Sequence, residues 1–325
     1  MRFTLRIEII LMLPAALALL APAVTAQSYP SRAIRLIVPF PPGGATDTTS
    51  RIMAHWLSQS LGQQVVVDNR PGATGRIGTE LVAKAQPDGY TLLFGSAGPN
   101  VILPAAYSKL PYDAVNDFAP VSLVAHSDHV LVMHPSVPAR SVKDLVALAR
   151  RRPGQLTFAS AGSLSVAHMS GELFKQVAKV DMVHVPYKGG GLAIVASFTG
   201  EVSMYFGGAP TIAAYKNSSK LKLVATTGSK RSRLFPELPT VGETLPGYAV
   251  TQWLGFLAPA RTPNEIVAKL NAEIVRAVSN PRASEQLVSV GADPATTSPD
   301  EFLSYIRNEI VKWAKVVKAS GMVLE

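Results

Sequence analysis

Five short segments of the chain combine glycine with serine, threonine or proline, and each follows an expected β-strand. They are residues 40–47, 70–76, 95–100, 160–165 and 187–191. Glycine lets a ligand approach the backbone, and hydroxyl groups add hydrogen-bond donors. Backbone N–H groups at helix N-termini attract carboxylates without a matching cation. Turn chemistry explains any one segment, but five of them after strands in both halves favour one shared anion-binding site.

These segments do not match the nucleotide-binding motifs. Gly72, Gly75 and Gly78 have a G-x-x-G-x-x-G spacing, whereas the dinucleotide fingerprint is G-x-G-x-x-G. Lys188 precedes its glycines, whereas the lysine of a phosphate-binding P-loop follows them. The chain has no cysteine, which excludes thiol nucleophiles, disulfides, iron–sulfur clusters and Cys-ligated zinc. We therefore expect no cofactor.

Serine and histidine residues offer weaker alternatives. The chain has no G-x-S-x-G motif, so a hydrolase that uses Ser165 and His168 is a minor alternative. His126, His129 and His134 are not spaced to meet on one face of a strand, because residues three apart point to opposite faces. The sequence therefore predicts no metal site.

The elements that must position these segments alternate between short apolar strands and amphipathic helices. One set of them covers residues 30–124 and another covers 130–250, which predicts an α/β fold. Asp47 is interpreted as the cap of a helix that begins at Thr48. The helices after Trp253 have no strands of their own, so we expect them to cover the sheet of the first set.

This arrangement predicts two lobes, each with a mainly parallel sheet flanked by helices. Domain 1 is expected to comprise residues 27–124 and 253–325, and domain 2 residues 125–252. The chain then crosses between the lobes twice, near Ala125 and near Gln252. Paired crossovers of this kind suit a protein that closes on a ligand.

The first 26 residues have the pattern of a secretory signal peptide. Arg2 and Arg6 precede an apolar stretch at 9–20, and small residues lead up to Ala26. We predict cleavage after Ala26 and a location in the periplasm. No later segment has the ~18 uninterrupted apolar residues of a membrane span. The net charge of +9 comes without basic clusters interleaved with aromatic residues, so we expect no nucleic-acid partner.

Long motifs in the chain resemble those of the solute receptors of tripartite tricarboxylate transporters, the Bug proteins. The resemblance covers nearly all of the sequence after the leader, in the same order. It is carried above all by residues 34–47, 65–75, 87–93, 184–189 and 253–259. It implies a monomeric periplasmic binding protein of type II that closes like a flytrap and has no catalytic activity. It also implies delivery of an organic acid to a membrane permease with one large and one small subunit.

The resemblance also implies where the ligand binds. Segments 40–47 and 72–75 would hold one carboxylate, segment 96–100 would complete the wall, and segment 160–168 would meet the other end of the ligand. The predicted ligand-binding residues, including two glycines that leave room for the ligand, are Phe40, Pro41, Pro42, Gly43, Gly44, Ala45, Thr46, Asp47, Gly72, Ala73, Thr74, Gly75, Ser96, Ala97, Gly98, Asn100, Ser160, Gly162, Ser163, Leu164, Ser165, His168, Tyr187, Lys188, Gly207 and Gly208.

The chain departs from the family pattern at two places. Many relatives carry an aspartate after the strand that ends near Phe206, and here Gly207 and Gly208 follow it. Without that carboxylate an ammonium group has no partner, which argues against an amino-acid ligand. Leu164 adds apolar surface, so our hypothesis is a dicarboxylate or an aromatic dicarboxylate such as terephthalate. A receptor that feeds a membrane signalling protein is the alternative, whereas the inducer-binding domain of a LysR-type regulator is disfavoured by the leader.

Overall fold

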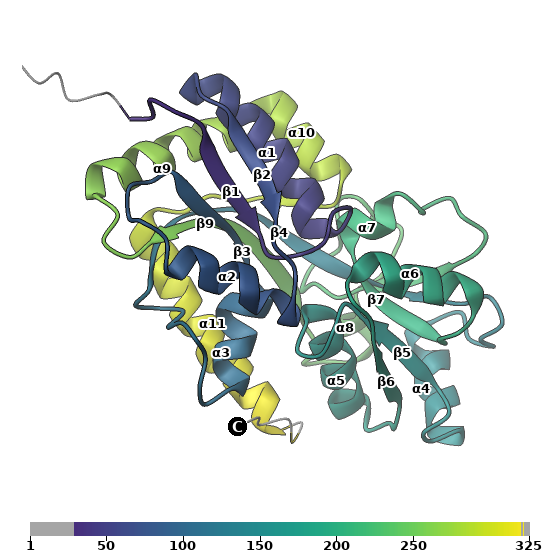
Figure 1. Cartoon of the computed structure of the whole chain (residues 1–325). Coiled ribbons are helices and arrows are strands. Elements are labelled where there is room, and N and C mark those ends of the chain that lie inside the picture. Colours follow the sequence, from purple (N-terminus) through teal and green to yellow (C-terminus); the bar gives the residue numbers. More distant parts are fainter. Residues whose placement is uncertain (1–28, 320, 322–325) are drawn as a thin grey trace, which may run out of the picture.

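The computed structural model of the chain describes residues 29–319 and 321, and the predicted signal peptide lies outside them. The first lobe begins with three parallel strands in the order β2-β1-β3, each followed by a helix (Figure 1). Its elements are β1 (Ile34–Val38), α1 (Ala45–Leu61), β2 (Val65–Asn69), a short 3₁₀ turn (Ala73–Gly75), α2 (Arg76–Ala83), β3 (Thr91–Ser96), a π-helical turn (Gly98–Ile102) and α3 (Leu103–Ala106).

A single long strand, β4 (Phe118–Met133), runs through both lobes. Its middle residues stay extended because both lobes offer a pairing partner. Residues 118–128 pair antiparallel with β9 (Thr251–Pro259). From His129 onward, β4 pairs with strands of the second lobe. The change of partner therefore lies between Asp128 and His129.

The second lobe repeats the alternation of strands and helices. Strands β7, β5 and β6 are parallel neighbours, and β8 pairs with β4. The elements are α4 (Val142–Arg151), β5 (Thr157–Ser160), α5 (Val166–Ala178), β6 (Val183–Pro186), α6 (Gly190–Thr199), β7 (Met204–Gly208), α7 (Ala209–Ala213), β8 (Lys222–Thr226) and α8 (Val241–Thr244). Both lobes thus combine parallel pairs with antiparallel pairs to the crossover strands, so the sheets are mixed rather than mainly parallel.

The last helices pack against the first lobe. They are α9 (Asn264–Ser279), α10 (Pro281–Ser289) and α11 (Pro299–Ala319), with the short strand β10 (Asp293–Pro294) paired to β4. Figure 1 shows α9 and α10 beside α1, and α11 beside α3. Phe302 and Trp313 of α11 are fully buried, which accounts for the attachment of this helix through the hydrophobic effect. No helix among residues 29–319 is long and apolar enough to cross a membrane.

The start of α1 differs from the prediction. The helix begins at Ala45, and Gly44 occupies the capping position without any side-chain hydrogen bond. Asp47 therefore lies inside the first turn and does not cap the helix. The first N–H groups of α1 are left without a side-chain partner, which matters for the site described next.

Candidate functional site

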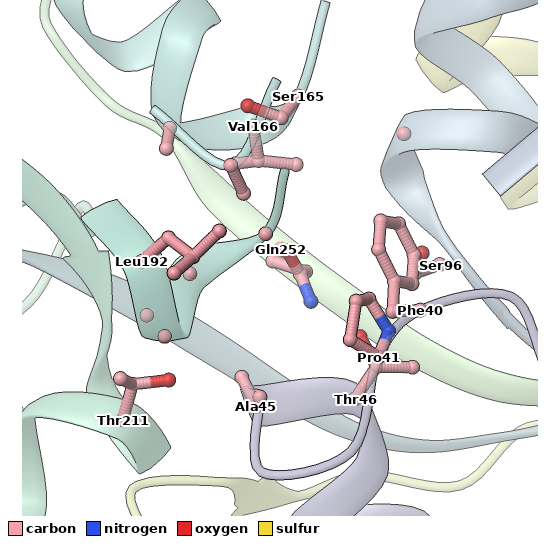
Figure 2. Close-up of a pocket in the computed structure, with 18 of the residues that line it drawn as sticks. Phe40, Pro41, Ala45, Thr46, Ser96, Ser165, Val166, Leu192, Thr211 and Gln252 are labelled. Atoms are coloured by element: carbon pink, nitrogen blue, oxygen red, sulfur yellow. The ribbon is translucent and has the colours of Figure 1, made fainter. Parts of the chain in front are cut away.

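A cavity of about 340 Å³ lies between the lobes and is lined by both of them and by the crossover strands. Figure 2 shows Gln252 extending from β9 toward its middle, with Leu192 of the second lobe on one side and Phe40 and Pro41 of the first lobe on the other. A volume of this size falls at the small end of the range of about 300–1,000 Å³ that is typical of small-molecule sites.

Eleven residues predicted from the sequence line this cavity. They are Phe40, Pro41, Pro42, Gly44, Ala45, Thr46, Ser96, Gly98, Ser165, Lys188 and Gly208. Most of the first-lobe group belongs to the loop that connects β1 to α1. The sequence could predict this wall because one contiguous segment builds it at the carboxyl end of a strand.

Other predicted residues form the rim of the cleft instead of the cavity wall. The Thr74 hydroxyl donates a hydrogen bond of 2.8 Å to the carbonyl of Ser163, which joins the two lobes directly. Gly162 lies on the other side of this contact, and Gly75 lies behind the Phe40 ring. Segment 72–75 and segment 162–164 therefore bridge and support the site rather than line it. Among these residues Gly72, Ala73 and Leu164 likewise do not line the cavity.

Asp47 is used inside the first lobe. Its carboxylate accepts hydrogen bonds from the Gly43 N–H at 2.9 Å and from the Asn69 amide at 2.9 Å, and it pairs with Arg51. Burial alone would raise the pKa of Asp47, but the hydrogen bonds from Arg51, Gly43 and Asn69 outweigh burial and lower it. Asp47 and Gly43 thus fix the shape of the binding loop and do not contact the cavity.

Ala97 and Asn100 are also fully buried behind the first-lobe wall. The Asn100 side-chain oxygen accepts a hydrogen bond from the Ser96 N–H, so it positions the serine that does line the cavity. In the second lobe, Gly207 makes room for Ile212 and Tyr205, since a Cβ at that position would lie 2.5 Å from the Ile212 side chain.

The predicted Ser165–His168 pair is not a catalytic pair. Ser165 accepts a hydrogen bond from the backbone N–H of His168, as a helix cap does, and the His168 ring accepts one from the Leu164 N–H at 3.0 Å. The ring also stacks on His184 at a centroid distance of 3.7 Å. Burial, followed by the nearby His184, lowers the pKa of His168 to about 3. The imidazole is thus a neutral support for the loop.

Two more predicted residues have structural partners. The Ser160 hydroxyl and the His184 Nε2 atom lie 2.6 Å apart, and Ser160 also bonds to the backbone of Gly162. Tyr187 donates its hydroxyl proton to Glu201. Neither Ser160 nor Tyr187 lines the cavity. Ser160 and His168 both contact His184 and form a packing layer beneath the second-lobe loops, whereas the Tyr187 hydroxyl has its partner at the surface.

Half of the lining residues are absent from the predicted set of ligand-binding residues. The additional lining residues are His129, Ala161, Val166, Ala167, Gly189, Gly190, Gly191, Leu192, Tyr205, Thr211 and Gln252. The three glycines Gly189–Gly191 already belong to segment 187–191, and extending that segment by one residue adds Leu192. His129 and Gln252 carry no local signal, because their exposure to the cavity depends on how β4 and β9 cross between the lobes.

The electrostatics of the cavity come mainly from the backbone. Helices α1 and α6 both begin at its wall, and their capping glycines Gly44 and Gly189 provide no side-chain hydrogen bond. Free N–H groups and the helix dipole make each N-terminus attractive to an anion. Lys188 is the one lysine or arginine on the wall, counted over the described residues, and no Asp or Glu of that part of the chain lines it.

Close approach of the lobes depends on two glycines. A Cβ on Gly208 would lie 3.1 Å from the Ala45 side chain, and one on Gly189, where φ is +113°, would lie 3.3 Å from Pro41. Both pairs cross from one lobe to the other. Side chains at these positions would hold the lobes apart, so the glycines permit the closed arrangement.

Two lobes joined by crossover strands around an anion-attracting cavity define a solute-binding protein of the periplasmic type. Residues 49–322 match the model of the tripartite tricarboxylate transporter family receptor, and the chain belongs to this family. It is thus a transport receptor and not an enzyme. Protein BugT of Bordetella pertussis is 38% identical over 308 residues, covering 94% of this chain and 94% of that protein.

Solved structures agree with this assignment. Rpa4515 of R. palustris, a structure with adipate, superposes with a TM-score of 0.87 at 35% identity and covers 90% of this chain and 98% of its own. MatC (Rpa3494) from Rhodopseudomonas palustris, with bound malate, gives a TM-score of 0.82 at 32% identity and covers 89% of this chain and all of its own. The expected α/β fold of a periplasmic binding protein is therefore confirmed.

Proposed function

We propose that this protein binds an organic acid in the periplasm and presents it to the large and small permease subunits of a tripartite tricarboxylate transporter. The observation that carries the proposal is the convergence of two uncapped helix N-termini, those of α1 and α6, on one cavity between the lobes. Family membership and the two relatives with adipate and malate support an acid as the ligand.

The carboxylate is expected at the start of α1. The N–H groups of Ala45 and Thr46 belong to the first turn and have no side-chain cap, and Ser96 lines the same wall. A carboxylate there accepts hydrogen bonds from backbone donors and interacts favourably with the helix dipole. The ligand thereby supplies the cap that Gly44 does not provide.

The rest of the cavity favours a dicarboxylate, including aromatic diacids such as terephthalate. Apolar atoms of Phe40, Pro41, Val166 and Leu192 form much of the wall and suit an apolar or aromatic spacer between two carboxylates. Glutamate is a poor fit, because its ammonium group would enter a cavity whose described wall holds no carboxylate to neutralise the charge.

Isothermal titration calorimetry of the purified protein tests this proposal. The panel comprises adipate, malate, terephthalate, citrate and glutamate at pH 7.5. We expect at least one dicarboxylate to bind at least about tenfold more tightly than glutamate, a difference of about 1.4 kcal/mol. Tight binding of glutamate alone would overturn the choice of ligand class.

A deletion strain separates transport from signalling. If the protein serves a permease, cells without it lose uptake of the acid that the purified protein binds. If uptake is unchanged while an acid-dependent transcriptional response disappears, the protein is instead the receptor of a signalling system.

A further inference from the structure

The net charge of the protein is concentrated in the second lobe. Residues 129–250 hold 14 lysines and arginines against 6 aspartates and glutamates, which leaves a formal charge of +8. The described residues of the first lobe, 29–128 and 251–319, hold 15 against 14, which leaves +1. Both lobes combine strands and helices in the same way, so the fold does not require this difference. Such an uneven distribution indicates a surface that meets an anionic partner.

Much of the excess positive charge surrounds helix α4. Figure 1 shows this helix at the outer end of the second lobe, away from the first lobe. The Arg150 guanidinium donates a 3.0 Å hydrogen bond to the carbonyl of Ala178, the last residue of α5. The Gly154 N–H donates one of 3.3 Å to the carbonyl of Asp181, just before β6. The end of α4 therefore lies beside the end of α5 and the start of β6. We call the exposed cations of this region the basic pole, and they are Arg140, Lys143, Arg150, Arg151, Arg152 and Lys179.

Carboxylates of the protein do not neutralise the basic pole. Asp144 stands in the first turn of α4, and the Asp181 side chain lies beside Gly154. Against the six cations of the pole, these two acids leave a local charge of +4. The second-lobe lysines and arginines that do form ion pairs, counted over the described residues, are Lys175, Lys216, Arg231 and Arg233. The positive charge of the pole thus faces solvent.

Stabilisation of the helices explains only part of the basic pole. The helix dipole favours cations at the C-terminal end of a helix, which accounts for Arg150 and Arg151 in α4 and for Lys179 after α5. Arg140 and Lys143 stand instead at the N-terminal end of α4, where the dipole disfavours a positive charge. The charge at that end therefore serves the surface rather than the helix.

The outward face of α4 carries charge without an apolar anchor. The apolar face already packs into the lobe through Val142, Leu145, Val146, Leu148 and Ala149. On the opposite face, Lys143 and Arg150 lie two turns apart with Ala147 between them. Protein interfaces are built around buried aromatic or large apolar residues. An anionic membrane surface needs no such anchor, because its charge is spread over a plane, and clusters of about four to eight basic residues bind it. The basic pole therefore fits a lipid surface better than a protein.

We propose that the basic pole binds the surface of membranes that contain anionic phospholipids. The inference goes beyond the proposed function, which gives the protein a reason to meet a membrane but no contact with lipid. Because the apolar face of α4 is buried in the lobe, the helix does not insert between lipids, and salt reverses the binding. Strand β5 starts at Thr157, close to the pole, and ends at Ser160, next to Ala161 of the cavity wall. Lipid at the pole therefore does not occupy the ligand site.

Co-sedimentation with vesicles tests the basic pole. The purified protein is mixed with phosphatidylcholine vesicles that contain about 30% phosphatidylglycerol, or with phosphatidylcholine vesicles alone, in buffer of low ionic strength. We expect the wild type to prefer the anionic vesicles by at least about 100-fold. Raising NaCl to about 0.5 M should release it, because screening shortens the range of the attraction to about 4 Å. The triple variant Lys143→Gln, Arg151→Gln, Arg152→Gln should prefer the anionic vesicles by about tenfold or less, since each basic residue near such a surface contributes about fivefold.

A matched control removes the same charge from the first lobe. The triple variant Arg282→Gln, Arg307→Gln, Lys315→Gln changes three exposed cations there and should bind the anionic vesicles like the wild type. Thermal denaturation checks that both triple variants are folded, as expected for replacements of exposed side chains.

Three outcomes would overturn the inference. If the two triple variants lose equal affinity for the anionic vesicles, net charge governs the binding and the basic pole does not. If the wild type binds anionic and neutral vesicles alike, the surface has no electrostatic preference for lipid. If it ignores the vesicles but binds soluble polyglutamate through the pole residues, the partner is an acidic protein. Calorimetry with the panel of acids reads out the proposed function separately, so the receptor function stands or falls independently of each outcome.

Discussion

The two sides of the cavity are built in different ways. The first-lobe wall is one contiguous loop and the helix that follows it, fixed from behind by Asp47 and Asn69. The opposite side combines the start of α6 with single residues that come from β4, β7, α7 and β9. A local segment can be recognised along the chain, whereas a composite surface exists only after folding. The comparison suggests that the first wall supplies general affinity for carboxylates and the composite side supplies selectivity.

The first wall should be the more sensitive of the two to an added charge. In Gly44→Asp, a carboxylate stands at the α1 N-terminus and competes with that of the ligand, and a Cβ there meets only the Pro41 carbonyl at 3.8 Å. We expect affinity for the best diacid to fall by about 100-fold, roughly 2.7 kcal/mol, with little change in melting temperature. Gly44→Ala is the matched neutral control and should stay within about threefold of the wild type. If both variants bind like the wild type, the carboxylate does not lie at this helix.

As the pH falls, the second-lobe side of the cavity should lose stability at a higher pH than the first-lobe wall. Burial lowers the pKa of His129 to about 4 and of His168 to about 3, so the unfolded chain binds more protons than the folded one below pH 6.5. Each of these two histidines is therefore expected to lower the free energy of unfolding by about 2 kcal/mol between pH 7 and pH 5, since one pKa unit corresponds to about 1.4 kcal/mol. Asp47, whose pKa is lowered, contributes stability that is lost only below about pH 4.

Denaturant unfolding measured at several pH values, with hydrogen exchange to locate the change, checks this order. Asp128 acts in the opposite sense, because burial raises its pKa to about 6 and its protonation on acidification favours the folded state. In Asp128→Asn that compensation is absent, so the loss of stability between pH 7 and pH 5 should be steeper. If hydrogen exchange on acidification increases first in β1 and α1, the expectation that acid destabilises the second side first is wrong.

A charge on the second side should have a smaller effect than one at Gly44. Leu192 stands in the first turn of α6 and is 54% exposed, so Leu192→Asp is expected to fold. The added carboxylate repels an anionic ligand through partly hydrated space, and we expect about tenfold weaker binding. Leu192→Asn removes the same apolar surface without the charge and isolates the electrostatic part. If Leu192→Asp weakens binding as much as Gly44→Asp does, the two sides of the cavity contribute equally to binding of the anionic ligand.

Removing the hydrogen bond between the lobes should have the smallest effect on ligand affinity. Thr74→Val removes the hydrogen bond to the Ser163 carbonyl and keeps the shape of the side chain. Because one solvent-exposed hydrogen bond contributes about 0.5–1 kcal/mol, we expect affinity to fall by about threefold. Ser163→Ala changes the same loop but keeps the carbonyl, and should bind like the wild type. Small-angle scattering with and without a saturating diacid measures whether the Thr74→Val protein closes less completely.

The residue pattern along the chain predicts the fold class and the segment that forms the first-lobe wall of the cavity. Alternating strands and helices predict the α/β lobes, and the helices after Trp253 have no sheet except that of the first lobe to cover. Segment 40–47 is recognisable because glycine and hydroxyl residues after a strand act through their immediate neighbours. The physical reason is that these features depend on interactions between residues a few positions apart.

The remaining features of the site depend on how distant segments meet in the folded protein. Asp47 could be taken for a helix cap until the start of α1 was known, and Ser165 with His168 could be taken for a catalytic pair until their partners were seen. His129 and Gln252 reach the cavity because β4 changes partners after Asp128 and because β9 lies beside it. Such contacts join residues more than a hundred positions apart, and no local pattern encodes which face of a crossover strand will meet the ligand.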